Sequence, residues 1–126
     1  MKVIKTDKAP LPLGPYSQGI LYGNLIFVSG QLGIDPKTGK LKEEFREEAL
    51  QALNNLKAVV EAAGGSRCSI VKVTVYTTDI SRFKEFNEVY REFFSGCPVL
   101  PTRAVVEVKG LPAGASVEVE CIAVRG

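Results

Sequence analysis

Two charged side chains lie in strand-like stretches where they could bind a ligand or assist catalysis. Arg103 belongs to residues 101–108, PTRAVVEV, whose side chains alternate with a period of two, so Arg103 and Val105 share one face. A guanidinium beside an apolar side chain needs an anion, because burying an unpaired charge is costly. This stretch alone allows two interpretations: a cross-strand surface salt bridge, or a fork that holds a ligand carboxylate or phosphate through two parallel hydrogen bonds.

The second charged side chain is Glu118, which lies between Val117 and Val119, with Glu120 on the same face of a final alternating stretch. If this stretch pairs with residues 101–108 as a hairpin, and odd residues face even ones, Glu118 shares a face with Arg103. A pair of glutamates on an outer strand is the structural alternative.

Three further positions offer polar groups to a pocket. Asn87 interrupts the apolar stripe of a helix, and its alternative role is a hydrogen bond from the helix border to a backbone group. Tyr16 follows a rigid Gly-Pro turn that can present its phenol, although loop tyrosines also serve in packing. Ser29 and Gly30 end a strand where glycine lets a ligand approach the backbone, and turn formation is the alternative.

The residue types that are missing restrict the chemistry further. The chain has no histidine, which excludes Ser-His-Asp and Cys-His catalysis and histidine metal sites, and no C-x-x-C or G-x-G-x-x-G motif occurs. We therefore expect no metal and no cofactor. The three cysteines, Cys68, Cys97 and Cys121, are odd in number and widely spaced, which predicts reduced thiols in a cytoplasmic protein.

Length and composition indicate one domain, residues 1–126, with a single core. Hydrophobic residues make up 45% and charged residues 24% of the chain, a balance typical of soluble globular proteins. The net charge is +2 and the basic residues are scattered among glutamates, which argues against nucleic-acid binding. No apolar run is long enough to cross a bilayer, and residues 1–10 lack the apolar segment of a secretory signal.

The elements that must position these residues follow from periodicity and turn signals. Alternation predicts strands at residues 2–5, 18–22, 25–29, 69–78, 101–108 and 116–124. A period of 3.6 predicts helices at about residues 43–63 and 82–94. This order predicts an α+β fold in which two helices cover one face of a mixed sheet. Because the last two strands carry apolar residues on both sides, notably Val105, Ile122 and Val124, we expect other subunits to cover the second face.

Six stretches together resemble the RidA branch of the RidA/YjgF family. They are GPYSQ (14–18), SGQ (29–31), DPKTG (35–39), NEVY (87–90), PTRAVVEV (101–108) and VEVECIAV (117–124). The resemblance runs through nearly the whole chain with the family's spacing. It implies a chorismate-mutase-like fold and a cytoplasmic homotrimer with three sites at the subunit interfaces.

The resemblance also implies an activity, namely the hydrolysis of 2-iminoalkanoates and their enamine tautomers to 2-oxo acids and ammonia. Such reactive species arise from pyridoxal-phosphate-dependent dehydratases that act on serine or threonine, so the role would be metabolite damage control. Arg103 matches the family's carboxylate-binding arginine, and Glu118 matches the acid that handles the attacking water. The matching pocket residues are Tyr16, Ser29, Gly30 and Asn87.

The sequence departs from the family pattern at Val105, where many members have cysteine. That thiol is not the nucleophile of the family's proposed mechanism, so hydrolysis stays possible and the backbone of Val105 would supply any contact. One alternative is a non-catalytic metabolite-sensing trimer that binds 2-oxo acids through Arg103; binding a carboxylate does not need a second carboxylate such as Glu118 nearby. Another alternative, action on RNA, conflicts with the scattered charge and the lack of an aromatic and basic platform.

Overall fold

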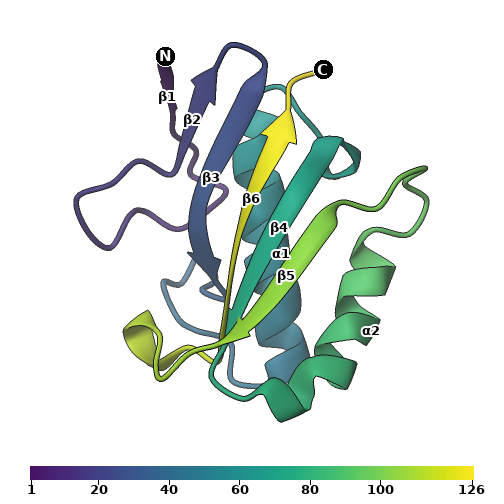
Figure 1. Ribbon diagram of the computed structural model, residues 1–126. Coiled ribbons are helices and arrows are strands. Elements are labelled where there is room, and N and C mark those ends of the chain that lie inside the picture. Colours follow the sequence, from purple (N-terminus) through teal and green to yellow (C-terminus); the bar gives the residue numbers. More distant parts are fainter.

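The computed structural model describes all 126 residues, and its main feature is a six-stranded sheet with two helices behind it (Figure 1). The strands are β1 (Lys2–Ile4), β2 (Gly19–Tyr22), β3 (Leu25–Leu32), β4 (Ile70–Thr77), β5 (Thr102–Glu107) and β6 (Val117–Val124). The helices are α1 (Phe45–Ala62) and α2 (Phe83–Phe93). The predicted α+β architecture, with both helices on one face of a mixed sheet, is confirmed.

The order of the strands across the sheet is β1-β2-β3-β6-β4-β5. Residues 101–108 therefore do not pair with the final strand as a hairpin, which was the condition for Arg103 and Glu118 to share a face, because β4 lies between β5 and β6. The physical reason is the connection through α2, since a strand that returns by a helix pairs in parallel with the strand before it. The last strand then fills the central place, antiparallel to both β3 and β4.

The core lies between the sheet and the helices. The stripe predicted for α1 is buried, with Leu53 and Leu56 fully inaccessible, and Glu44 caps the helix by accepting the N–H groups of Arg46 and Glu47. On β6, Val117, Val119, Cys121 and Ala123 alternate into this core.

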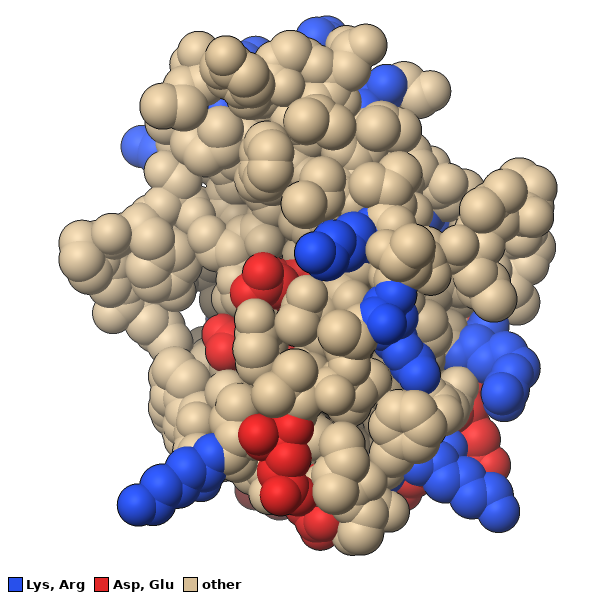
Figure 2. Space-filling view, in the orientation of Figure 1, with Lys and Arg blue, Asp and Glu red and all other residues tan.

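The other face of the sheet is not covered within the chain. Tyr22, Phe27 and Val106 are exposed there, and Ile122 and Val124 are half-buried on the same side, as expected. Val105, in contrast, lies on the helix-covered face, where it pairs with the buried Val75. Seen from the open side, the upper middle of this face shows no acidic side chain, and acidic side chains gather lower down (Figure 2).

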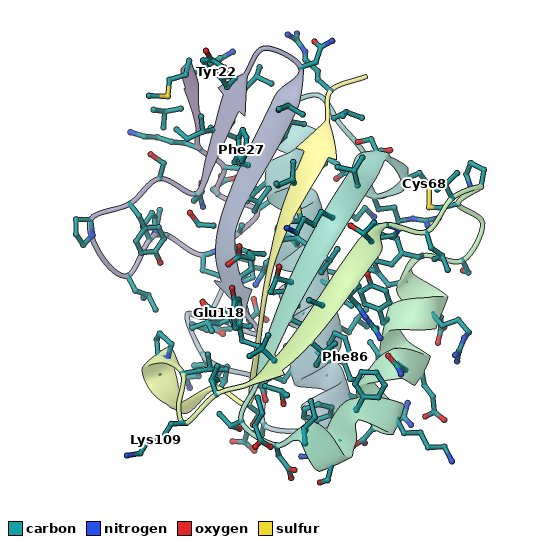
Figure 3. All side chains as sticks on the ribbon, in the orientation of Figure 1. Tyr22, Phe27, Cys68, Phe86, Lys109 and Glu118 are labelled. Carbon is teal, nitrogen blue, oxygen red and sulfur yellow. A yellow bond between two sulfur atoms is a disulfide. The ribbon has the colours of Figure 1, made fainter.

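The structure corrects the expectation of three reduced thiols. Cys68 and Cys97 form a disulfide, and only Cys121 is free, in the core. Sequence spacing could not reveal this pair because the two cysteines are 29 residues apart. They meet because β4 and β5 run in parallel, so the segments that precede both strands begin at one end of the sheet (Figure 3). No helix combines the length and the apolar character needed to cross a membrane.

Candidate functional site

A cavity of about 600 Å³ lies between the extended loop at residues 10–16 and the ends of β3 and β6. Four predicted site residues line it together: Tyr16, Ser29, Gly30 and Glu118. Glu118 lies on the viewer's side of β6, close to the end of β3 (Figure 3). The structure therefore brings these four of the predicted site residues together, and Arg103 and Asn87 do not line this cavity.

The loop over the cavity is anchored by Gln18, which sequence reasoning did not single out. Its buried side chain accepts the N–H of Thr6 and donates to the carbonyl groups of Thr6 and Pro10, at 2.8 to 3.0 Å. Ser29 Oγ donates to the carbonyl oxygen of Ser17 at 2.6 Å. These hydrogen bonds give partners to backbone groups of the loop that would otherwise lack them. They also fix the loop that forms one wall of the cavity and carries Tyr16. The sequence feature that could have identified Gln18 is its position as a long polar side chain directly after a Pro-rich loop.

Gly30 allows the carboxylate of Glu118 to lie against the β3 backbone. A Cβ atom at position 30 would lie 2.3 Å from Glu118 Oε2, which is far inside contact distance. The pKa of Glu118 is raised, chiefly by burial and also by the neighbouring charge of Glu120. A carboxyl group with a raised pKa beside a cavity is suited to accepting and donating protons near neutral pH.

A second group of predicted residues lies on the other side of the sheet. Arg103 donates from Nη1 to Asn87 Oδ1 at 2.7 Å, and its Cζ lies 4.7 Å from the ring centre of Tyr90 and 5.2 Å from that of Phe83. Asn87 thus bonds a guanidinium and not a backbone group. Arg103 forms no salt bridge with any carboxylate of the chain, so the interpretation as a cross-strand salt bridge is wrong.

Tyr90 belongs to this second group, although it was not among the predicted site residues. Its hydroxyl is buried and has no hydrogen-bond partner, and burial raises the pKa of Tyr90 to about 12, against the opposing effect of Arg103. The phenol therefore stays neutral, and its ring supports the guanidinium through a cation–π contact.

The register of the strands places the two groups on opposite faces. Arg103 is opposite Val73, which is opposite the buried Cys121, so Arg103 faces the helices. Glu118 is opposite Tyr76, which is opposite the exposed Val106, so Glu118 is on the open face. The pairing that would have let Arg103 and Glu118 share a face of one chain is therefore not formed.

A guanidinium with no carboxylate partner and a partly buried carboxylate beside a cavity are features of a protein that binds small carboxylate-bearing molecules. The family model described as Endoribonuclease L-PSP matches residues 6–125. The chain therefore belongs to this family, which is the RidA/YjgF family of the sequence resemblance.

The relatives are similar over their full length. A RutC family protein of Aquifex aeolicus is 51% identical over 125 residues, covering 99% of this chain and 100% of the relative. The 2-iminobutanoate/2-iminopropanoate deaminase of Rattus norvegicus is 47% identical, covering 99% and 90%. The crystal structure of Escherichia coli TdcF with bound serine superposes with a TM-score of 0.96 at 42% identity and covers all of both chains.

Proposed function

We propose that this protein hydrolyses 2-imino acids and their enamine tautomers to 2-oxo acids and ammonia in the cytoplasm, without a metal or cofactor. The observation that carries the proposal is the Arg103 guanidinium, which is held by Asn87 and Tyr90 but bonds to no carboxylate of its own chain. A substrate carboxylate is a natural partner for the rest of the fork. The name of the rat relative supports the same activity.

The active unit we propose is a homotrimer with composite sites. Within one chain Arg103 and Glu118 lie on opposite faces of the sheet, so one small molecule cannot contact both. The open face exposes Phe27 and Val106, which a neighbouring copy would cover. Each site would take the Glu118 group, with Tyr16, Ser29 and Gly30, from one protomer. The Arg103 group, with Asn87 and the backbone of Val105, would come from the next protomer.

The chemistry needs little beyond positioning. The substrate's C2 is electrophilic once its nitrogen is protonated, so a well-placed water can attack without a covalent intermediate. Glu118 accepts a proton from this water as the C2–O bond forms, and it returns the proton to the nitrogen. The C2–N bond then breaks, ammonia leaves, and the hydroxyl proton is lost as the 2-oxo group forms. In sum, one iminium and one water give one 2-oxo acid and one ammonium ion.

The test couples the protein to a threonine dehydratase and follows the decay of the imine intermediate. Arg103→Ala should lose nearly all of the acceleration and keep its oligomeric state, and Lys57→Ala on α1 provides a charge-matched control outside the proposed site. A fully active Arg103→Ala variant would show that the assignment of the carboxylate-binding residue is wrong.

A mixing experiment tests the composite site. Arg103→Ala and Glu118→Gln variants, each inactive alone, are unfolded together and reassembled at equal amounts. If each site joins halves of two protomers, about a quarter of the sites in random assemblies regain both native halves. Activity should then recover to about that fraction, and no recovery would contradict sites shared between protomers.

The non-catalytic alternative has one observation in its favour, since the TdcF structure carries bound serine and so shows a relative with a small ligand. A sensor would need Arg103 but not Glu118. In an enzyme, Glu118→Gln should slow turnover far more than it weakens binding of a 2-oxo acid such as 2-oxobutanoate, measured by calorimetry. Equal losses in turnover and binding would mean that Glu118 has a purely structural role, and a wild-type protein that binds the 2-oxo acid without accelerating imine decay would favour the sensor.

A further inference from the structure

Two carboxylates, Glu118 and Glu120, line the same cavity, and only one of them is held by the chain. They are two residues apart on β6, so their side chains leave the same face of the sheet with their Cα atoms about 7 Å apart. Glu120 accepts a hydrogen bond from Tyr76 Oη at 3.0 Å, whereas no side-chain hydrogen bond acts on Glu118. The pair is therefore asymmetric.

Tyr76 creates this asymmetry through its place in the ladder. It lies directly opposite Glu118 on the adjacent strand β4, so its ring stands beside the Glu118 side chain. Its hydroxyl, however, reaches diagonally to Glu120, which is opposite Thr74. The ring of Tyr76 therefore displaces water beside Glu118, and its hydroxyl holds the Glu120 carboxylate in place next to Glu118.

We propose that Tyr76 and Glu120 are a positioning pair that makes Glu118 the stronger proton acceptor of the two carboxylates. This inference rests on the proposed function, because Glu118 is the group that takes a proton from the attacking water. Neither Tyr76 nor Glu120 needs to touch the substrate. A fixed negative charge beside Glu118 favours the neutral carboxyl group and so strengthens Glu118 as a base.

Few other charges oppose this effect from the surrounding elements. On β4, Lys72 lies farther along the open face, opposite Ile122, and forms no ion pair with either glutamate. β3 carries no titratable side chain, and Tyr16 is the one titratable side chain that the loop at residues 10–16 contributes to the cavity. Glu48 of α1 lies on the far side of the sheet, where it accepts the N–H groups of Ser116 and Val117. Glu120 is therefore the dominant charge near Glu118 within the chain.

The test measures the protonation of Glu118 directly and separately from catalysis. Protein labelled with ¹³C at the glutamate carboxyl carbons is titrated by NMR, and the Glu118 signal is assigned by its loss in Glu118→Gln. Glu120→Gln keeps an acceptor for Tyr76 but removes the charge, so the Glu118 titration midpoint should move to lower pH. Tyr76→Phe should move the Glu118 midpoint in the same direction but by less. The Glu120 carboxylate keeps its charge in this variant but loses the hydrogen bond that holds it near Glu118. Glu61→Gln, an exposed change on α1, should leave the Glu118 midpoint in place.

Kinetics then connect the pair to turnover. The acid-side limb of the pH profile of kcat/KM should move to lower pH in Glu120→Gln by the same amount as the NMR midpoint. The kcat plateau should fall roughly 3- to 10-fold with little change in KM, as expected for a weaker base and one lost interaction. An unchanged midpoint, or an unchanged limb in an active enzyme, would overturn the inference. If the wild-type protein does not hydrolyse imines, the proposed function is refuted. The role of Tyr76 and Glu120 in catalysis is then refuted too, even if the NMR midpoints shift as expected.

Discussion

Gly30 offers a test that separates the site from the fold. A methyl group at this position would lie 2.3 Å from Glu118 Oε2, and ordinary contact begins at 3.4 Å, so the carboxylate must retreat by about 1 Å. A misplacement of about 1 Å in a reacting group costs roughly 100-fold in rate. We therefore expect Gly30→Ala to reduce kcat/KM by about two orders of magnitude in the dehydratase-coupled assay.

The same substitution should leave the fold intact. The group that must move is the end of a flexible side chain, and the φ angle of Gly30 is not among the positive ones. Removing glycine also reduces the entropy of the unfolded chain, which offsets part of the strain, so the free energy of unfolding should change by less than about 1 kcal/mol.

Gly33 provides the matched control for Gly30. A methyl group there would lie 2.3 Å from the backbone carbonyl oxygen of Glu48 on α1, which cannot move without the helix. Gly33→Ala should lower the free energy of unfolding by about 1–3 kcal/mol, measured in urea. If Gly30→Ala is fully active, or if it loses as much stability as Gly33→Ala, the steric reasoning is refuted.

Three further predictions concern the remaining buried or linked groups. Reducing the Cys68–Cys97 disulfide, which closes a loop over a separation of 29 residues, should lower the free energy of unfolding by about 3–4 kcal/mol, seen in urea titrations with and without dithiothreitol. Burial raises the pKa of Cys121 to about 12, so the folded protein should expose no reactive thiol at pH near 8, whereas unfolding should expose one without reductant and three with it. Glu48→Gln replaces a charged acceptor of two backbone N–H groups and should cost about 1–2 kcal/mol, whereas Glu47→Gln on the exposed side of α1 should change the unfolding midpoint very little.

Periodicity predicted the elements well because it reports local burial. The apolar stripe of α1 and the alternation of β6 both meet the core. Gly23, in the turn between the antiparallel strands β2 and β3, has a positive φ of 60°, which suits a two-residue hairpin turn. Periodicity could not predict which strands are neighbours, since that depends on long connections. For this reason the sequence did not predict that β5 pairs with β4, and it did not predict the disulfide between Cys68 and Cys97.

The candidate site was predictable in its residue types but not in its arrangement. Asn87 was identifiable because it interrupts the apolar stripe of a helix, and Arg103 and Glu118 because each is a charged side chain beside valines in a strand-like stretch. Alternation defines two faces for each strand separately, and the faces of different strands can be matched only when the order and register are known. The division into two groups on opposite faces therefore emerged from the pairings of β4 with β5 and β6.

This division has a consequence for the charge of Glu118. Within the chain the pKa of Glu118 is raised by burial and by Glu120, and no arginine opposes the rise. In the proposed assembly a neighbour's Arg103 would approach the empty site and lower that pKa, because an opposite charge favours the carboxylate. Bound 2-oxobutanoate, which carries a carboxylate but no iminium charge, would neutralise this guanidinium, so Glu118 should titrate at higher pH in that complex than in the free protein. The ¹³C titration of Glu118 with and without saturating 2-oxobutanoate measures this difference. Coincident midpoints would mean that Arg103 and Glu118 do not act on each other across one site.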